Sequence, residues 1–342
     1  METIIVHHRS SHHAKNSGYA RLVNFIDATQ IPTQKKVVPY KIAKLISSNS
    51  KQDAGIYNSD SVLKDIELFT LLIKNRTKNR VVHYLNGERD LRYCLKHSNI
   101  FKKTKFYATF HKPPEILKQQ ITNITNLKKL DGAIAVGENQ VEFLKNWLEL
   151  DNVKYIPHGV DTNFFRPDPL KVKDKTLLFV GQHLRDFDAF NYCIPKIAAN
   201  TKGLKVNVVI REDFNKFIDS HSSITIFNNI NDEELKELYQ EASILFLPLT
   251  NSTACNSILE AMACGLPIIT TDVGGNLGYL KNTNNIVAPN GDYDYLIDAT
   301  IDLLFNKNKI IEFGSSSREK SLSYEWNVIA NQVNNFYKEY NK

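Results

Sequence analysis

The 342-residue chain has only four cysteines, and they lie far apart, at Cys94, Cys193, Cys255 and Cys264. This spacing fits neither a disulfide framework nor a zinc-binding pair, and it is typical of a reducing compartment. No apolar run approaches the roughly 20 residues that cross a bilayer. Met1 leads directly into the strand-like residues 3–6, without the pattern of a signal peptide. We therefore expect a cytoplasmic protein, with enough residues for two domains of ordinary size.

The charge is distributed unevenly along the chain. Residues 1–170 hold 26 Lys and Arg against 16 Asp and Glu, whereas residues 171–342 hold 17 against 21. This asymmetry indicates that the first half faces an anionic partner, although a solvated basic face is an open alternative. Because no nucleic-acid-binding motif is present, we expect no nucleic acid partner. An anionic membrane, worth about 1 kcal/mol per basic residue, would meet Lys74, Arg76, Lys78, Arg80, Lys102, Lys103 and Lys105.

Both halves alternate short apolar segments with amphipathic ones, which predicts an α/β protein with parallel sheets. In the first half we expect strands at 3–7, 80–84, 106–110 and 132–136, and helices at 18–28 and 140–147. In the second half we expect strands at 176–180, 205–210, 244–247 and 268–271, and helices at 232–241 and 326–340. The proline- and glycine-containing segment 157–167 predicts a connection between two domains, with a boundary near residue 170.

The most informative segment is residues 247–275, LPLTNSTACNSILEAMACGLPIITTDVGG. A small polar loop leads into a helix that begins near Asn256 and carries Glu260. The amide groups at such a helix start can meet an anion, and a carboxylate one turn later can bind a diol. Together these features suit a nucleoside diphosphate with its ribose. The alternative is a buried helix without a ligand, since Leu259, Met262 and Ala263 have core character.

Residues 260–267, EAMACGLP, resemble the second half of the donor-site motif of retaining glycosyltransferases of family 4. Residues 157–167 and 232–242, with Arg318 and Trp326, are similar to further parts of that family. The resemblance implies the GT-B architecture, in which two Rossmann-like domains have parallel sheets facing a central cleft. We expect an acceptor-binding domain at 1–168, a nucleotide-sugar-binding domain at 169–322, and a last helix at 323–342 that crosses back to the first domain.

One position departs from the family's pattern. The first Glu of the motif should stand at position 252, where this chain has Ser252. The resemblance places that residue at the hydroxyls of the transferred sugar, so we count Ser252 among the catalytic candidates. Serine is shorter and neutral, so these contacts are lost or made through water. This departure from the family's pattern favours an unusual or acidic sugar, or a weakened enzyme.

The resemblance also implies the donor-binding residues. Arg185 would bind the pyrophosphate, Arg211 would replace a missing second cation, and Glu260 would accept hydrogen bonds from both ribose hydroxyls. The alternative for Arg185 is an ion pair with Asp186 or Asp188. The base would lie near residues 227–231. The full donor-binding set is Gly18, Gly181, Arg185, Arg211, Ile230, Thr253, Ala254, Cys255, Asn256 and Glu260.

In the first half, His111 ends a predicted strand, and open α/β sheets bind ligands at the carboxyl ends of their strands. The resemblance places His111 at the donor sugar, so the catalytic candidates are His111, Arg185 and Ser252. Acceptor binding would involve His8, His12, His13 and Tyr19. These histidines have no Asp, Glu or Cys at ligand spacing, and Asp292 caps a helix, so we expect neither a metal nor a cofactor beyond the nucleotide sugar.

The sequence thus predicts a metal-independent, retaining glycosyltransferase that uses a UDP- or GDP-sugar. The acceptor would be a hydroxyl of a glycan, a lipid-linked glycan or a glycolipid, and the enzyme could lie peripherally on the inner face of the membrane. The alternative is a non-catalytic partner protein that keeps the fold and binds a nucleotide or a glycan. Base, sugar, acceptor and oligomeric state stay open at this point.

Overall fold

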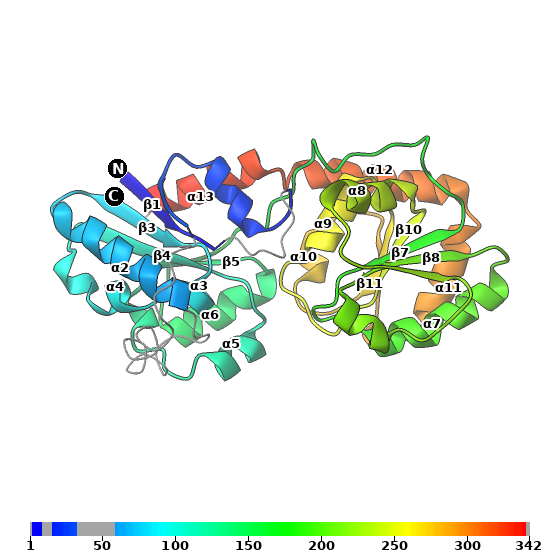
Figure 1. The fold of residues 1–342 in the computed structure, drawn as a ribbon, viewed down its shortest axis with the longest axis horizontal. Helices are drawn as coiled ribbons and strands as arrows, with labels where there is room; N and C mark the ends of the chain where they lie inside the picture. The colour runs from blue at the N-terminus through cyan, green and yellow to red at the C-terminus, as the bar shows by residue number, and fades with distance from the viewer. Residues whose placement is uncertain (1, 9–15, 33–58, 340–342) are drawn as a thin grey trace. The chain divides into compact units, whose positions relative to one another are not determined.

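A computed structural model describes residues 2–8, 16–32 and 59–339 of the chain (Figure 1). The chain divides into two compact units. The first contains residues 1–13, 18–157 and 329–342, and the second contains residues 14–17 and 158–328. The sequence places the boundary after residue 168, whereas here residues 158–168 already group with the second unit.

The first unit is built on a six-stranded parallel sheet with the order β2-β1-β3-β4-β5-β6. The strands are β1 (Glu2–Val6), β2 (Thr29–Ile31), β3 (Arg80–Tyr84), β4 (Thr104–Phe110), β5 (Gly132–Ala135) and β6 (Val153–Tyr155). The four strands predicted for this half are confirmed within one or two residues, and β2 and β6 are additional.

The first unit's sheet is accompanied by helices and 3-10 turns. They are η1 (Tyr19–Asn24), α2 (Ser59–Lys74), α3 (Gly87–Asp90), α4 (Tyr93–Lys96), η2 (Ser98–Ile100), α5 (Pro114–Gln120), η3 (Leu127–Lys129), η4 (Glu138–Gln140) and α6 (Val141–Leu148). The predicted helix at 18–28 is wrong. Tyr19, Leu22 and Val23 have helical spacing, but one short 3-10 turn buries all three. The chain then extends to pair β2 with β1.

The second unit is also built on a six-stranded parallel sheet, with the order β12-β11-β10-β7-β8-β9. Its strands are β7 (Thr176–Val180), β8 (Lys205–Val209), β9 (Ile224–Phe227), β10 (Ile244–Leu247), β11 (Ile268–Thr271) and β12 (Ile286–Ala288). The four predicted strands are confirmed. All residues of β7, β10 and β11 are buried, which explains why each appears in the sequence as a short run without polar alternation.

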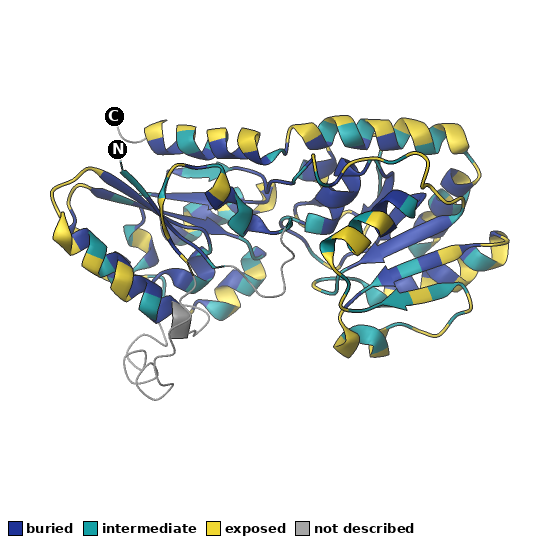
Figure 2. Ribbon diagram, turned by 45° about the horizontal axis from the view of Figure 1, so that its top comes forward, coloured by how far each residue is buried: buried dark blue, intermediate teal, exposed yellow. Residues whose placement is uncertain are grey.

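The helical elements of the second unit are α7 (Phe187–Asn200), η5 (Glu212–Phe217), α8 (Asp232–Glu241), α9 (Asn256–Ala263), α10 (Asn276–Leu280), α11 (Tyr293–Leu304) and α12 (Lys307–Leu322). Helix α7 packs against α11, and α9 packs against α12. Asn231 forms a capping box with Glu234 at the start of α8, and the predicted cap Asp292 is confirmed at the start of α11. In each unit the central strands are buried, the edge strands are partly exposed, and the helices expose one outer face (Figure 2).

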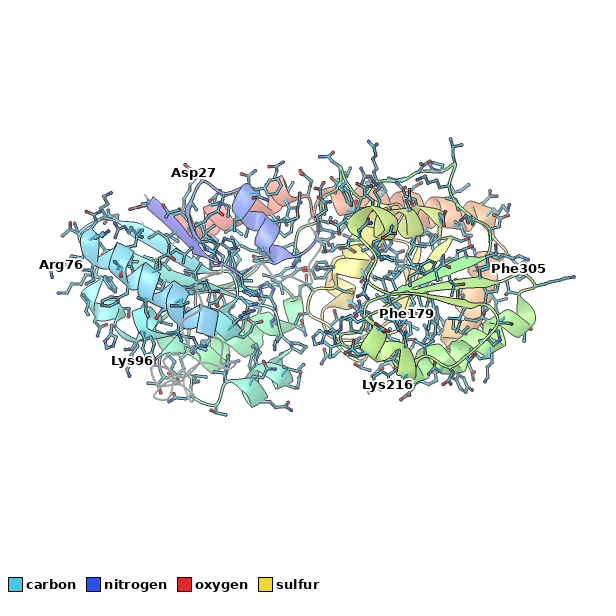
Figure 3. The ribbon with its side chains drawn as sticks, viewed as in Figure 1. Asp27, Arg76, Lys96, Phe179, Lys216 and Phe305 are labelled. Carbon is cyan, nitrogen blue, oxygen red and sulfur yellow. The ribbon has the colours of Figure 1, made fainter. Side chains whose placement is uncertain are left out.

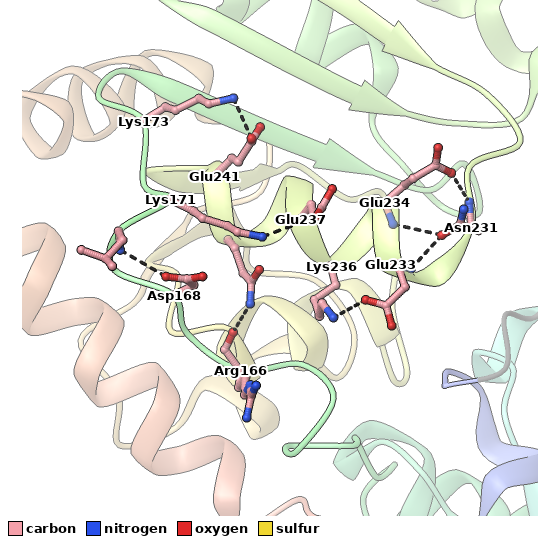
Figure 4. Close-up of polar contacts among 12 residues, drawn as sticks. Arg166, Asp168, Lys171, Lys173, Asn231, Glu233, Glu234, Lys236, Glu237 and Glu241 are labelled. Carbon is pink, nitrogen blue, oxygen red and sulfur yellow. Dashed lines mark hydrogen bonds and ion pairs between the residues drawn. The ribbon is translucent and has the colours of Figure 1, made fainter.

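Residues 166–173, which follow the connection between the units, lie along α8 in the second unit. Lys171 pairs with Glu237 and Lys173 pairs with Glu241, while the Gln240 amide donates to the Arg166 carbonyl at 2.8 Å (Figure 4). Arg318 on α12 donates through Nη1 to the carbonyl oxygens of Thr162, Phe165 and Ala263, at 3.0, 3.2 and 2.7 Å. These bonds fix the segment that follows residue 158 to the second unit.

The last helix, α13 (Trp326–Glu339), is divided between the two units. Its first residues, Trp326–Val328, group with the second unit, and the remainder groups with the first. The Trp326 ring packs so closely on Gly159 that a Cβ there would lie 2.4 Å from it. Within the described residues, no helix has the length and apolar character that crossing a bilayer requires.

Candidate functional site

The first component of the candidate site is the loop that follows β7 in the second unit. Gly181 has φ +88°, a conformation that side chains rarely adopt. A Cβ on Gly181 would also lie 2.6 Å from the Arg185 Nη2 atom. Glycine at this position therefore allows the turn at the strand exit and leaves room for the Arg185 guanidinium.

Arg185 is held by neutral partners. Its Nε donates to the Val180 carbonyl at 2.8 Å, its Nη1 to the His183 carbonyl at 2.8 Å, and its Nη2 to the Ser257 hydroxyl at 3.0 Å. In the part of the chain that the structure describes, no ion pair joins Arg185 to an acidic side chain. The Asp186 carboxylate instead caps α7 by accepting the Ala189 N–H. The predicted alternative of an ion pair with Asp186 or Asp188 is therefore wrong here, and a positive charge sits beside the start of α9.

Two loops are joined edge to edge at this point. Arg185 and Leu249 form an isolated antiparallel bridge. The Thr250 N–H donates to the Leu184 carbonyl at 3.0 Å, and the Asp186 N–H donates to the Pro248 carbonyl at 3.0 Å. The loops after β7 and β10 come from neighbouring strands, so both leave the same edge of the sheet. This pairing places Arg185 next to the polar loop that begins α9.

The polar loop itself is shaped by the second glycine loop of the sequence. A Cβ on Gly274 would lie 2.0 Å from the Ser252 carbonyl oxygen, so only glycine allows this approach. The Gly275 N–H donates to that same carbonyl at 2.9 Å. Ser252, Thr253 and Cys255 are buried, and Ala254 and Asn256 are half-buried. The loop therefore has a fixed backbone, which is what amide recognition of an anion needs.

Glu260 lies one turn into α9 and is only 5% exposed. Its Oε2 accepts the Tyr239 hydroxyl at 2.9 Å, and its Oε1 accepts the hydroxyl of Ser17 at 2.5 Å. Ser17 groups with the second unit. Burial raises the pKa of the Glu260 carboxyl to about 7, against the opposing effect of these two hydrogen bonds. A carboxylate that accepts two hydroxyl groups in this way has the geometry that a vicinal diol requires.

Two further predicted donor-binding residues stand apart from this set. Arg211 is nearly half exposed, pairs with Asp213 at 2.8 Å, and lies over the Phe214 ring. Ile230 is half-buried against the core beside Asn229, which has φ +55°. Both follow strands of the same sheet, but no bond in the described residues links them to Arg185 or Glu260.

His111 lies in the first unit, directly after β4. Its Nε2 is 2.6 Å from the Leu85 carbonyl oxygen, and because a carbonyl only accepts, Nε2 carries the proton. The His111 backbone N–H donates to the Glu88 carboxylate at 3.2 Å. Glu88 is buried in the short helix α3, which follows β3. His111 therefore has a fixed tautomer and a fixed backbone position.

The remaining first-unit candidates surround the carboxyl end of β1. Gly18 has φ +90° and precedes η1. Tyr19 is buried, and its ring meets the His111 ring edge to face, with centroids 4.7 Å apart. His8 is half-buried. His12 and His13 lie outside the described residues. Within those residues, no group of three or more His, Cys, Asp or Glu is arranged to hold a metal ion.

The basic residues predicted to meet a membrane differ in their exposure. Lys74, Arg76, Lys78, Lys102 and Lys103 are exposed, and Figure 3 shows Arg76 and Lys96 at the outer margin of the first unit. Lys105 pairs with Asp131 at 2.8 Å. The inclusion of Arg80 is wrong: its side chain is 2% exposed and pairs with Glu2 at 2.8 Å, because position 80 begins the central strand β3.

The sequence did not point to several of these residues. Nothing in the sequence spacing of Tyr239 indicates its hydrogen bond to Glu260. Glu88 is different, because it directly follows Asn86-Gly87 at the exit of β3, and a charged residue beside such a turn is a signal that the sequence carries.

Comparisons with known proteins address the second unit most directly. Residues 174–306 match the family described as glycosyl transferases group 1. Among curated proteins, the phosphatidylinositol N-acetylglucosaminyltransferase GPI3 subunit of Saccharomyces cerevisiae is 25% identical over 62% of this chain and 51% of its own length. The GDP-mannose-dependent alpha-(1-6)-phosphatidylinositol monomannoside mannosyltransferase of Mycobacterium tuberculosis is 22% identical over 54% of this chain and 55% of its own. The chain thus spans about half the length of these relatives.

Solved structures match over nearly the whole chain. Sucrose-phosphate synthase from Thermosynechococcus elongatus has a TM-score of 0.70 at 16% identity, covering 99% of both chains. The Anabaena protein HepE, solved in complex with UDP and glucose, has a TM-score of 0.68 at 12% identity, covering 99% of this chain and 100% of its own. At such identities the likeness establishes the fold, which is the two-sheet α/β fold of these proteins.

Proposed function

We propose that the protein transfers a sugar from a nucleoside diphosphate to an acceptor hydroxyl, because residues 174–306 match the glycosyl transferases group 1 family and the chain has the GT-B fold. The observation that carries the proposal is one arrangement in the second unit. It combines a guanidinium that pairs with no carboxylate among the described residues, a rigid polar loop at a helix start, and a buried carboxylate one turn further on.

Each part of this arrangement matches one part of a nucleotide sugar. The Arg185 charge and the amides that begin α9 would meet the pyrophosphate, since helix N-termini and cations stabilise phosphate groups. The Glu260 carboxylate would accept the two ribose hydroxyls, at roughly 1.5–3 kcal/mol for each charge-assisted bond. In this structure the two oxygens of Glu260 accept the hydroxyls of Ser17 and Tyr239, so ribose would share the carboxylate with them or displace them. The donor would be a UDP- or GDP-sugar, and no metal ion would be needed for its charge.

The proposed reaction keeps the anomeric configuration, as the resemblance to family 4 implies. The bond between the anomeric carbon and the phosphate oxygen breaks, and a bond from the acceptor oxygen to that carbon forms on the same face. The departing phosphate takes the acceptor's proton. Arg185 and the α9 amides stabilise the charge that develops on the phosphate. His111, with its Nε2 proton fixed by Leu85, would present Nδ1 to the reacting sugar.

We place the acceptor with the first unit, and propose a lipid-linked glycan or glycolipid at an anionic membrane. The exposed basic residues lie among exposed apolar ones: Ile66 is 46% exposed and Ile73 43% on α2, and Ile100 is 46% exposed in η2. The contact of Phe69 with Phe101 joins α2 to the segment after η2. Exposed apolar side chains on segments that also carry exposed lysine and arginine suit insertion at a charged lipid surface. The two curated relatives named above act, by their names, on phosphatidylinositol compounds.

The test of donor use is turnover with defined nucleotides. The wild-type protein is mixed with UDP- and GDP-sugars, with and without glycolipid acceptors, and released nucleoside diphosphate is measured. Release that requires His111 and Glu260 supports the proposal. Nucleotide binding without release in any mixture supports instead a non-catalytic partner protein. The replacement of the expected glutamate by the buried Ser252 is the observation that favours this second function.

A further inference from the structure

Four buried side chains of the first unit form one line of contacts that ends at His111. The line begins at Tyr337 on α13, whose hydroxyl is 2.6 Å from His83 Nδ1. His83 Nε2 is 2.8 Å from the Thr109 hydroxyl, and that hydroxyl is 3.4 Å from the Tyr19 hydroxyl. The Tyr19 ring then meets the His111 ring edge to face. All four side chains are buried, with exposures of 7% for Tyr19, 2% for Tyr337 and 0% for the other two.

The line has few ways to distribute its protons. Burial lowers the pKa of His83 to about 3, so its imidazole is neutral and has one N–H and one lone pair. His83 therefore donates to one of its two partners and accepts from the other. The Thr109 hydroxyl has a single proton to donate. If it donates to His83 it accepts from the Tyr19 hydroxyl, and if it accepts from His83 it can donate to the Tyr19 hydroxyl. Removing one hydroxyl leaves a buried nitrogen or oxygen with a lost partner and disturbs the rest of the line.

The position of the line explains how it can act on His111. Thr109 lies on β4, two residues before His111, which directly follows that strand, and His83 lies on the adjacent strand, β3. The two strands pair in register, with His83 opposite Tyr107. The backbone and Nε2 of His111 are fixed by Glu88 and Leu85. The tilt of its imidazole ring still depends on what packs against it, and the Tyr19 ring supplies such a contact.

We propose that Tyr337, His83, Thr109 and Tyr19 are positioning residues that set the orientation of the His111 imidazole for glycosyl transfer. None of the four is a catalytic residue in this account, because the line acts through the ring of Tyr19. The inference rests on the proposed role of His111. It adds that the docking of α13 through Tyr337 is a condition for correct placement of that imidazole.

The experiment uses Thr109→Val, which removes the central hydroxyl with little change in volume, and Tyr337→Phe, which removes the terminal one. The matched control is Tyr84→Phe: Tyr84 is equally buried on the same strand as His83, and its hydroxyl bonds to Asp65 outside the line. We expect kcat to fall roughly ten- to a hundred-fold in the two test variants, as for a small misplacement of a reacting group. The KM for the donor should stay close to that of the wild type, Tyr84→Phe should keep kcat, and Thr109→Ser should restore it.

A spectroscopic readout separates this inference from the proposed function. With 15N-labelled histidine, His111 is assigned by the loss of its signals in His111→Gln, and its ring signals are then compared among the variants. Shifted or broadened His111 signals in Thr109→Val and Tyr337→Phe, but not in Tyr84→Phe, support the positioning line even if no transfer activity is found for the wild type. Unchanged His111 signals with unchanged kcat in both test variants would overturn it, as would an equal loss of kcat in Tyr84→Phe.

Discussion

The ionisation of Glu260 should affect stability and binding in opposite directions. As the pH rises, we expect the unfolding free energy to fall and the nucleotide affinity to grow. Burial raises the pKa of its carboxyl from the ordinary value of 4.5 to about 7. Between these values the folded protein keeps a proton that the unfolded chain has lost. The stabilisation from this group is therefore fully present below about pH 4.5 and is lost as the pH rises to about 7. The pKa difference corresponds to about 3 kcal/mol.

The perturbation that reveals this is Glu260→Gln, which keeps the shape of the side chain and removes its titration. We expect the unfolding free energy of the wild type, relative to the variant, to fall by about 3 kcal/mol from pH 4.5 to pH 8. The assay is chemical denaturation at several pH values. Glu237→Gln is the control, since Glu237 lies on α8 with its carboxylate largely in solvent. A wild-type to variant difference that stays constant from pH 4.5 to pH 8 would refute the reasoning.

The same titration predicts the opposite trend for ligand binding. Only the ionised carboxylate accepts hydrogen bonds from both ribose hydroxyls, so the advantage of the wild type over Glu260→Gln in nucleotide affinity should grow as the pH rises to about 7. Calorimetric titration of UDP and GDP into both proteins at pH 5.5 and pH 8 measures this. An affinity ratio that is equal at the two pH values would remove Glu260 from the ribose role.

Three further predictions follow from single contacts. Gly181→Ala and Gly203→Ala both place a side chain at positive φ, but only at position 181 does the new Cβ meet Arg185. Both should lose about 1 kcal/mol of stability, and only Gly181→Ala should weaken nucleotide binding; equal binding by both would count against the Arg185 role. Arg318→Ala leaves three buried carbonyls without their donor and should cost roughly 1–3 kcal/mol of unfolding free energy; an unchanged denaturation midpoint would contradict this. Neutralising Lys74, Arg76 and Lys78 together should weaken binding to anionic vesicles by about 3 kcal/mol at low salt; binding equal to that of wild type in sedimentation would reject the membrane contact, and Arg211→Gln, which removes an exposed cation of the second unit, is the control.

The second unit was predictable because its sequence signals are local. Strands such as β7 and β10 are short apolar runs, and caps such as Asn231 and Asp292 act within three residues. The motif at residues 260–267 fixes a helix, its stop and a carboxylate within one segment. The pairing of Arg185 with the loop after β10 also follows from strand order once the sheet is known to be parallel.

The errors arose where distant residues decide the outcome. Residues 18–28 have helical spacing, but the pairing of β2 with β1 interrupts the helix. Arg80 belongs to a basic run in the sequence, yet its place at the start of a central strand buries it against Glu2. The line from Tyr337 to Tyr19 joins residues from four elements, so no spacing along the chain could indicate it.

The central claim is that the second unit binds a nucleoside diphosphate sugar through Arg185, the α9 loop and Glu260. The most direct test is thermal unfolding of the wild type and Glu260→Gln against UDP-, GDP-, ADP-, CMP- and dTDP-sugars. A ligand at 100 times its dissociation constant should add about 2.7 kcal/mol of stability. The account predicts this gain for the wild type with one nucleotide diphosphate class, and a much smaller gain for Glu260→Gln. No gain with any nucleotide sugar, or an equal gain in both proteins, would contradict it.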